Sequence, residues 1–290
     1  MPATDTLIIG AGRMGRGIGL ALSQAGGRSR LFSRSQDRVV APVAAEAAGG
    51  LGAAVGTADL VVLAVPDDAI ANVARELAET GGVRPGQTIL HLSGLLDRSV
   101  LSALSGSGAA LGSFHPLQTI ADPTSAPALL RGAVAGIEGD ARALASAIEL
   151  ARRLGMRPIV IRADGKAAYH AGAAMVANYT VALAGVAQRL AEQAGVDPVE
   201  AGQIYLPLLE GALGNLRKLG AVHGLTGPIR RGDVETVRAH LAVLDATTAR
   251  LYRSAGLEAL QLARAAGLDP SKADAMATEL GEPSGGSGEE

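Results

Sequence analysis

The stretch Leu7-Ile8-Ile9-Gly10-Ala11-Gly12-Arg13-Met14-Gly15 decides the fold of this chain. Its three apolar residues, rich in β-branching, are typical of the end of a buried strand, and residues 17–25 have the character of a helix. Between them, three glycines follow the spacing G-x-G-x-x-G. Gly10 would permit a tight turn, Gly12 would let the backbone approach a pyrophosphate, and Gly15 would let the helix pack closely on the strand. This order of strand, glycines and helix predicts a dinucleotide-binding turn.

The composition excludes several classes of function. The 290 residues suffice for one large domain or two smaller ones, and with 48% hydrophobic but only 2% aromatic residues the core must consist of Ala, Leu, Val and Ile. A net charge of −2 gives no electrostatic case for nucleic-acid binding, and the absence of Cys excludes disulfides and thiolate chemistry. The N-terminus has no basic region of the kind that begins a signal peptide, so we expect a cytoplasmic protein.

Residues 167–188 carry no formal charge over the length of a membrane span. Their apolar positions are mostly Ala and Gly, and polar residues such as His170 and Asn178 interrupt them. This composition suits a helix buried inside protein, so we expect no membrane association.

The first half of the chain alternates predicted strands with helices of roughly 10 to 15 residues, which predicts βαβ units and a parallel sheet. The predicted strands cover residues 7–9, 30–33, 51–55, 59–67, 88–93, 110–114, 133–137 and 157–162, and the later helices cover 38–48, 69–79 and 140–154. Residues 59–67 contain the clearest buried strand, and Pro66 stands just beyond its apolar run, where it would end the strand.

From Asp164 onward we predict only helices. They cover residues 166–194, 198–219, 233–266 with a break, and 270–280. The fold class is therefore α/β, with a Rossmann-type parallel sheet domain over residues 1–163 and an all-helical domain over 164–281. Residues 282–290, rich in Pro, Gly, Ser and Glu, are expected to be a disordered tail.

The end of the second strand indicates which dinucleotide binds. A site for NAD usually has an acidic residue there, about 20 residues after the glycines, to hold the ribose 2′-OH. Here Ser33-Arg34-Ser35 occupies that place, and Arg38 follows one turn later. A guanidinium and hydroxyls suit the 2′-phosphate of NADP, although both arginines could instead be solvated residues at a helix start. We predict NADP(H), with candidate contacts at Gly10, Gly12, Arg13, Met14, Gly15, Ser33, Arg34, Val65 and Pro66.

Several motifs carry a family resemblance. The pattern G-A-G-R-M-G, the segment 62–67 and the helical second half resemble the 6-phosphogluconate-dehydrogenase-like superfamily. That superfamily includes β-hydroxyacid dehydrogenases, ketopantoate reductases and pyrroline-5-carboxylate reductases. Over residues 5–270 the chain is more closely similar to the family of Rossmann-like proteins with a DUF2520 C-terminal domain. The motifs are His91-Leu92-Ser93-Gly94, Ser113-Phe114-His115-Pro116-Leu117-Gln118-Thr119, Tyr169-His170 with Asn178, and Leu225-Thr226-Gly227-Pro228-Ile229-Arg230-Arg231-Gly232-Asp233.

The resemblance implies a role for the start of the first helix in the second half. β-Hydroxyacid dehydrogenases have a K-x-x-N-N pattern there, in which lysine is the acid/base and asparagine binds substrate. This chain has Lys166-Ala167-Ala168-Tyr169-His170, so the lysine matches and both asparagines do not. Lys166 is therefore a candidate proton donor, and His170 could share or take that role.

Helix geometry separates these candidates. Lys166 and His170 lie on one face, roughly 6 Å apart along the axis, so both could reach one small substrate. Asn178 lies roughly 18 Å from Lys166 and is rotated by about 120°, so it could face the cofactor or the partner domain. The alternatives are a solvated lysine and a core histidine.

His115 follows an apolar strand at a point where crevices bind ligands, and a neutral imidazole can donate or accept a proton. It could instead merely end the strand before Pro116. His91 and Ser93 could line the same crevice.

Thr226-Gly227-Pro228 is typical of a helix start, whose free N–H groups, with Arg230 or Arg231, would suit a substrate carboxylate. A tight interhelical turn with surface arginines is the alternative. No cluster of residues has metal-ligand spacing, so no metal is expected.

These features predict an NADPH-dependent oxidoreductase of the CH–OH class that reduces a small 2-oxo acid. Ketopantoate (2-dehydropantoate), giving pantoate in pantothenate biosynthesis, is the leading substrate. The alternatives are reduction of a cyclic imine such as pyrroline-5-carboxylate, or a non-catalytic NADP(H)-binding module. The candidate catalytic residues are Lys166, His170 and His115, and the candidate substrate ligands are Ser93, Asn178, Thr226 and Arg231. Small residues in the helical half, such as those at 171–174, favour a homodimer, in which Arg230 and Arg231 could serve the neighbouring subunit.

Overall fold

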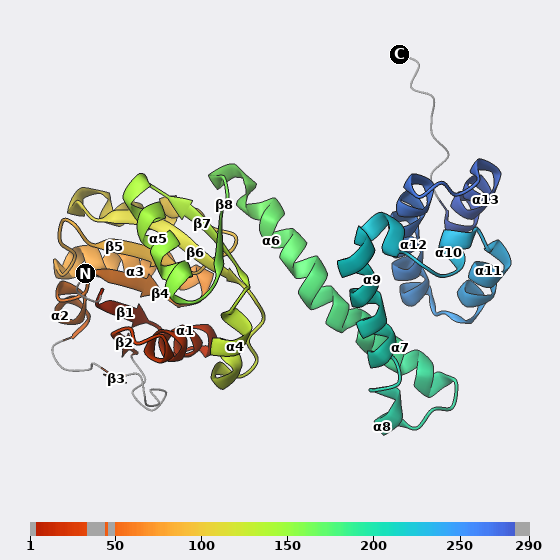
Figure 1. Ribbon diagram of the computed structural model, residues 1–290, viewed down its shortest axis with the longest axis horizontal. Helices are drawn as coiled ribbons and strands as arrows, with labels where there is room; N and C mark the ends of the chain where they lie inside the picture. The colour runs from red at the N-terminus through yellow and green to blue at the C-terminus, as the bar shows by residue number, and fades with distance from the viewer. Residues whose placement is uncertain (1–3, 34–43, 46–49, 282–290) are drawn as a thin grey trace, which may run out of the picture. The chain divides into compact units, whose positions relative to one another are not determined.

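The computed structural model describes residues 4–33, 44–45 and 50–281 (Figure 1). Within these residues, eight strands form one sheet in the order β3-β2-β1-β4-β5-β6-β7-β8. The strands are β1 (Thr6–Ile9), β2 (Ser29–Phe32), β3 (Ala44–Ala45), β4 (Leu60–Leu63), β5 (Thr88–His91), β6 (Ala110–Leu117), β7 (Val134–Gly139) and β8 (Arg157–Val160). All neighbouring pairs are parallel except β6 and β7. The predicted α/β class, a Rossmann-type sheet followed by helices, is confirmed.

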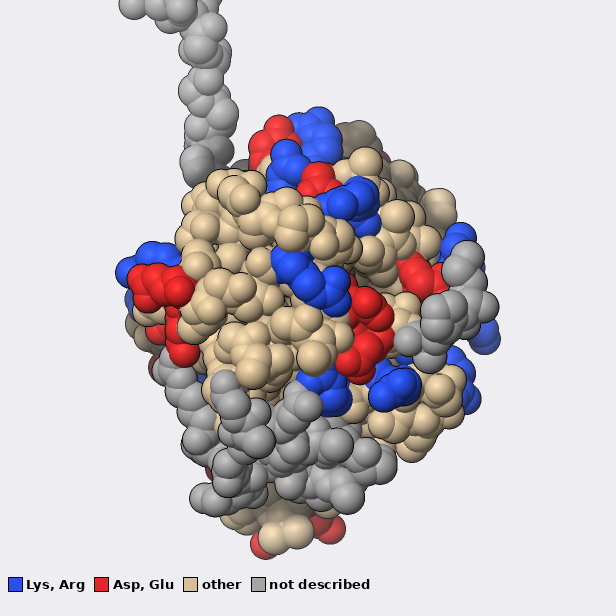
Figure 2. Space-filling view, turned by 90° about the vertical axis from the view of Figure 1, so that its left-hand side faces the viewer, with Lys and Arg blue, Asp and Glu red and all other residues tan. Residues whose placement is uncertain are grey.

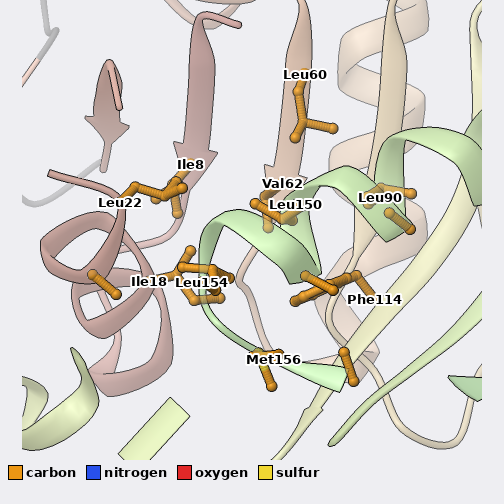
Figure 3. Close-up of a cluster of buried hydrophobic side chains, with 14 of the residues drawn as sticks. Ile8, Ile18, Leu22, Leu60, Val62, Leu90, Phe114, Leu150, Leu154 and Met156 are labelled. Carbon is orange, nitrogen blue, oxygen red and sulfur yellow. The ribbon is translucent and has the colours of Figure 1, made fainter. Parts of the chain in front are cut away.

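Helices connect the strands and cover both faces of the sheet (Figure 1). They are α1 (Arg13–Gln24), α2 (Gly50–Gly56), α3 (Asp67–Thr80), α4 (Ala126–Leu130), α5 (Ala141–Arg153) and the 3-10 segments η2 (Arg98–Ser107), η3 (Pro123–Ser125) and η4 (Ala163–Gly165). One core cluster joins the sheet to α1, α4 and α5 and includes Phe114, its one large aromatic side chain (Figure 3). The other lies between the opposite face and α2, α3 and η2. Each fully buried Leu, Ile or Phe contributes about 1.5–3 kcal/mol to stability.

Two local predictions are wrong. Residues 51–55, predicted as a strand, belong to α2, because Leu51, Ala54 and Val55 bury one helical face at the spacing i, i+3, i+4. Within the predicted helix 38–48, Ala44 and Ala45 form the edge strand β3 and pair with β2, so tertiary pairing overrides the helix preference of alanine. The remaining residues of that predicted helix lie outside the described residues.

The sheet also departs from the purely parallel arrangement that we expected. After β6 the chain turns back through η3 and α4, and α4 packs against α1. β7 therefore enters beside β6 in the opposite direction, and β8 follows β7 in parallel. The antiparallel register places Gly136 of β7 directly opposite His115 of β6.

The chain forms two compact units, residues 1–179 and 180–290. The first unit includes α6 (Lys166–Ala174) and a single π-helical turn, η5 (Met175–Tyr179), because the start of α6 packs on the sheet. This division lies beyond the predicted domain boundary at residue 163, which stays a prediction. The predicted tail, 282–290, lies outside the described residues.

The second unit is helical, and the part of the chain that the structure describes has no strand after Val160. Its helices are α7 (Thr180–Gln193), α8 (Pro198–Ala201), α9 (Leu206–Gly224), α10 (Pro228–Arg231), α11 (Val234–Val243), α12 (Ala246–Ala265) and α13 (Pro270–Leu280). The predicted end at residue 219 coincides with a kink in α9, where Gly220 has φ 72°. The break predicted within residues 233–266 lies between α11 and α12, and Asp245 caps the N-terminus of α12.

We expected the uncharged segment 167–188 to form a buried helix, but in the single chain all of its residues are exposed or half-buried. This expectation is wrong for the monomer. Within α6 and α7 the buried residues are Lys166 and Ala191, and α9 has none. Among the described residues of the second unit, α7 and α9 both expose large apolar side chains. Among the described residues, no helix combines the length and apolar character needed to cross a membrane. On the face of the first unit seen in Figure 2, charges of both signs are interspersed.

Candidate functional site

The glycine turn joins β1 to α1 and contains two points of close approach and one open position. A Cβ at Gly10, where φ is +116°, would lie 2.3 Å from the carbonyl oxygen of Ala64, and a Cβ at Gly15 would lie 2.2 Å from that of Gly10. A Cβ at Gly12 would meet no atom within 4 Å. Gly12 also caps α1 without a side-chain hydrogen bond to its first N–H groups. A phosphate group therefore fits beside Gly12, where the helix N-terminus favours an anion.

The other candidate cofactor contacts lie around this turn or at the end of β2. Arg13 is exposed, whereas Met14 packs partly against the first core cluster. Val65 is half-buried, and its Cγ1 would lie 3.2 Å from a Cβ on Gly10. Pro66, immediately before α3, is exposed, and Ser33, after β2, is half-buried. Arg34, Ser35 and Arg38 lie outside the described residues, so the predicted contact with a 2′-phosphate stays a prediction.

Ser93 connects the ends of β4 and β5. Its hydroxyl donates to Asp67 Oδ2 over 2.7 Å and accepts from the N–H groups of Leu95 and Leu96. Asp67 is the first residue of α3, directly after Pro66. These bonds fix the backbone that follows β5 against the start of α3.

Lys166 is buried, with 2% of its surface exposed. Its ammonium group donates to Ser113 Oγ over 2.8 Å and to the Ser93 carbonyl oxygen over 3.1 Å. Burial lowers the pKa of Lys166, and the negative charges of Glu138, Asp97 and Asp67 partly offset this effect. The alternative of a solvated lysine at a helix start is therefore wrong. The side chain ties α6 to β6 and to the segment that follows β5.

His91, the last residue of β5, is completely buried. Its Nδ1 accepts from the Ser93 N–H over 3.3 Å, and its Nε2 lies 3.2 Å from the Asp97 carbonyl oxygen. Burial, and secondarily the charge of Lys166, lower the pKa of His91 to about 4. His91 is thus a neutral structural residue that holds the turn after β5.

His115 and His170 converge over the backbone of Gly94. Their ring centroids are 5.7 Å apart, and a Cβ on Gly94 would lie 2.5 Å from His170 Cδ2 and 2.9 Å from His115 Nε2. Burial lowers the pKa of His115 to about 4, and the neighbouring His170 and Lys166 act in the same direction. His115 is neutral near pH 7, and its Nδ1 lies 3.0 Å from the Tyr169 hydroxyl.

The convergence follows from two simple periodicities. Ser113 and His115 are two residues apart on β6 and point to one face of the sheet. Lys166, Tyr169 and His170 have the spacing i, i+3, i+4 and share one face of α6. Because these two faces meet, a cluster of polar groups forms beside the carboxyl end of β5 and along β6.

The cluster is completed by four residues that were not among the predicted site residues: Ser113, Tyr169, Asp67 and Gly94. All four belong to the family motifs quoted above or to the segment 62–67, so the motifs gave a signal for their importance. Their contacts could not be predicted, because the bonds from Lys166 and Tyr169 reach partners more than 50 positions away.

The other predicted substrate ligands lie on different elements from the residues of this cluster. Asn178 is exposed within the π-helical turn. Thr226 belongs to the second unit, where it lines a mainly apolar cavity of about 350 Å³. Arg231 is exposed there and lies 3.8 Å from Asp233, whereas Arg230 donates to the Ala266 carbonyl oxygen over 3.0 Å. Gly227, rather than Thr226, caps the four-residue helix α10. The described residues contain no group of three or more His, Cys, Asp or Glu side chains that could hold a metal ion.

Known proteins show similarity over most of the chain. A curated protein of Streptomyces niveus named "Probable prephenate dehydrogenase NovF" is 32% identical over 200 residues, which are 64% of this chain and 52% of that protein. The chain thus spans about half the length of this curated relative. Protein TM1727 from Thermotoga maritima is 27% identical, with a TM-score of 0.69 over 90% of this chain and 98% of that chain. Plasmodium falciparum pyrroline carboxylate reductase, solved with NADP bound, is 14% identical, with a TM-score of 0.59 over 95% of this chain and 99% of that chain. The last likeness shows a shared fold.

Two family models match the chain in sequence. The model of the Rossmann-like domain matches residues 2–116, and the model of the domain of unknown function DUF2520 matches residues 133–276. The fold and the structural relatives are consistent with the 6-phosphogluconate-dehydrogenase-like superfamily. The chain therefore belongs to the family of proteins in which a Rossmann-like domain is followed by a DUF2520 domain.

Proposed function

We propose that the chain is an NADPH-dependent reductase of a small 2-oxo acid. One observation carries the proposal: the open position at Gly12 follows the carboxyl end of β1, and a pair of imidazoles lies over Gly94, just after the carboxyl end of β5 in the same sheet. In open α/β sheets, ligands bind in the crevice at this edge.

The residues of the glycine turn fit a dinucleotide. Gly10, Gly12 and Gly15 would hold the pyrophosphate against the N-terminus of α1, and Arg34 is proposed for the 2′-phosphate. The likeness of the fold to a reductase solved with NADP supports the same cofactor. When bound, NADPH would supply a hydride to the carbonyl carbon of the substrate.

Three side chains of the cluster stabilise charge on the substrate, orient its carbonyl group and donate a proton. Lys166 is covered and already engaged with Ser93 and Ser113, so we assign it the role of an electrostatic group that favours negative charge on the substrate oxygen. His115 is neutral and orients the carbonyl group. His170, the second imidazole over Gly94, is then the proposed donor of the proton to that oxygen.

The charge of Lys166 supports negative charge on the substrate, and the nearby carboxylates of Glu138, Asp97 and Asp67 partly offset it. The buried ammonium group of Lys166 has no ion pair within 4 Å among the described residues, which favours a carboxylate or a developing alkoxide nearby. Ketopantoate is the leading substrate, and we propose Ser93, Asn178, Thr226 and Arg231 as additional ligands. The CH–OH class follows if the substrate is an oxo acid.

A spectrophotometric assay tests this proposal. NADPH oxidation is followed at fixed protein concentration with ketopantoate and a panel of other 2-oxo acids, beside a direct titration of NADPH binding. We expect turnover with at least one 2-oxo acid. Tight NADPH binding without turnover on oxo acids or imines would contradict the reductase and favour the non-catalytic module.

The similarity in fold to pyrroline carboxylate reductase favours one second candidate, reduction of a cyclic imine. An imine that is already protonated needs no proton from a side chain. Pyrroline-5-carboxylate turnover that survives both Lys166→Ala and His170→Ala would support this candidate over the oxo acid.

We also propose that the chain acts as a homodimer through its helical unit. α9 exposes Leu208 at 70% and Leu219 at 55% of their surfaces, and α7 exposes Val181 at 73%. A second copy that covers these faces would remove a large apolar area from water. Sedimentation equilibrium should give twice the 29.1 kDa chain mass, and Leu208→Glu should shift the mass toward the monomer. A monomer at all concentrations would contradict the proposal.

A further inference from the structure

The phenol of Tyr169 is held between β7 and the ring of His115. Its hydroxyl lies 3.0 Å from His115 Nδ1, and the two rings meet edge to face with centroids 5.5 Å apart. On the other side, a Cβ at Gly136 would lie 2.6 Å from the hydroxyl oxygen. Because Gly136 stands opposite His115 in the sheet, the absence of a side chain there makes room for the phenol.

The protonation of the two rings sets the direction of their hydrogen bond. Burial raises the pKa of the Tyr169 phenol, so the hydroxyl keeps its proton. Burial lowers the pKa of His115 to about 4, so the ring is neutral and carries one N–H. A phenol is the stronger acid of this pair and an imidazole nitrogen the stronger base, so the O–H donates to Nδ1. The single proton of the imidazole is then on Nε2.

The Nε2 edge of His115 faces the open side of the cluster. It lies over Gly94 beside the ring of His170, and no described residue forms a hydrogen bond with it. Nor is it among the buried polar side-chain atoms that lack a partner in the described residues. Nε2–H is therefore a donor that is free for a substrate.

We propose that Tyr169 is a positioning residue that fixes His115 as the Nε2–H tautomer and so makes the site selective for a carbonyl oxygen over a protonated imine. The inference rests on the proposed reductase function. A carbonyl oxygen offers lone pairs to Nε2–H and becomes a stronger acceptor as it gains negative charge. The nitrogen of a protonated imine has no lone pair and presents an N–H of its own. Only the other tautomer, with a lone pair on Nε2, would accept that hydrogen.

Nuclear magnetic resonance of the histidine ring nitrogens tests the tautomer without any turnover. The long-range ¹H–¹⁵N correlations of His115 are compared in the wild type, in Tyr169→Phe and in Tyr252→Phe. The last variant is a matched control, because Tyr252 makes the same bond to His240 Nδ1 in the second unit. We expect Nε2–H in the wild type and in Tyr252→Phe, and a mixture of tautomers in Tyr169→Phe. Nδ1–H in the wild type, or an unchanged His115 in Tyr169→Phe, would overturn the proposal.

Kinetics test the consequence for the substrate. Tyr169→Phe should lower kcat for the 2-oxo acid at least about tenfold, with KM changed by less than about threefold and NADPH affinity unchanged. The ratio of imine to oxo-acid turnover should rise, and Tyr252→Phe should match the wild type. An unchanged kcat and ratio in Tyr169→Phe would contradict the role of Tyr169. A wild type that shows the Nε2–H tautomer but reduces no oxo acid would contradict the proposed function and leave the tautomer assignment standing.

Discussion

Each unit of the chain contains a tyrosine that is hydrogen-bonded to a histidine, and the two pairs have nearly the same geometry. The hydroxyl to Nδ1 distance is 3.0 Å for Tyr169 and His115 and 2.8 Å for Tyr252 and His240. Both pairs have edge-to-face rings, with centroids 5.5 and 5.8 Å apart. A local contact of this kind is therefore not by itself a functional site.

The surroundings separate the two pairs. His115 is half-buried where strands end, with a second imidazole and a buried ammonium group close by. His240 lies exposed on the helical unit. The edge of the sheet therefore gives the pair in the first unit its chemistry, because it buries polar groups and fixes their protonation.

The largest effect should come from removing the proposed proton donor. His170→Ala is expected to lower kcat about 10²–10⁴-fold, the range for loss of a general acid, while NADPH still binds. His240→Ala removes the histidine of the second pair and should leave kcat unchanged. Steady-state kinetics of both variants make the comparison, and equal activity of the two would erase the distinction between the units.

The next-largest effect is expected on the pH dependence of the free energy of unfolding, through the buried His91. The pKa of His91 is lowered from 6.5 to about 4, so the unfolded chain binds more protons between these values and stability falls as the pH falls through that range. The loss is about 3 kcal/mol once the pH is below the pKa of the folded state. Urea unfolding at several pH values should show a shallower acid dependence for His91→Gln than for the wild type. Parallel curves for the two proteins would show that burial of this ring is not linked to protonation.

A smaller effect is expected from the buried lysine. Lys166→Met keeps the apolar stem but leaves the Ser93 carbonyl and the Ser113 hydroxyl without their donor, which should cost about 1–3 kcal/mol. Lys272→Met, at an exposed position in α13, is the matched control and should cost less than about 0.5 kcal/mol. Urea unfolding measures both, and equal small losses would show that Lys166 is not needed to tie α6 to the sheet.

The smallest predicted effect concerns cofactor choice. Arg34→Asp should weaken NADPH binding at least about tenfold more than NADH binding, because a carboxylate repels the 2′-phosphate. Fluorescence titration of the two reduced cofactors measures the ratio. A loss of affinity that is equal for both would remove the assignment of Arg34.

The first unit could be predicted in outline because its signals are local. β1, the glycine turn and β4 are contiguous stretches, and the run from Leu60 to Leu63 is buried throughout, as its composition indicates. The antiparallel pairing of β6 and β7 could not be predicted, because strand direction depends on where the connecting segment packs.

The site could be predicted only in part for the same reason. The spacing of Lys166 and His170 predicts that they share one face of a helix, and both side chains do contact residues of the sheet. The burial of Lys166 depends on partners 73 and 53 residues away, and the bond of Tyr169 spans 54 residues. Gly94 and Gly136 leave room for the rings that lie over them, and this role can be recognised only from the structure.

The most direct test of the account is a titration of NADPH into the wild type and into Gly12→Asp. A side chain at position 12 would extend into open space, so the variant should fold normally, yet its carboxylate would occupy and repel the proposed phosphate position. We expect saturable NADPH binding by the wild type and affinity at least about 100-fold weaker in Gly12→Asp, with equal unfolding temperatures. No affinity of the wild type for NADPH, or equal affinity of the two proteins, would contradict the claim that this edge of the sheet is a reductase site.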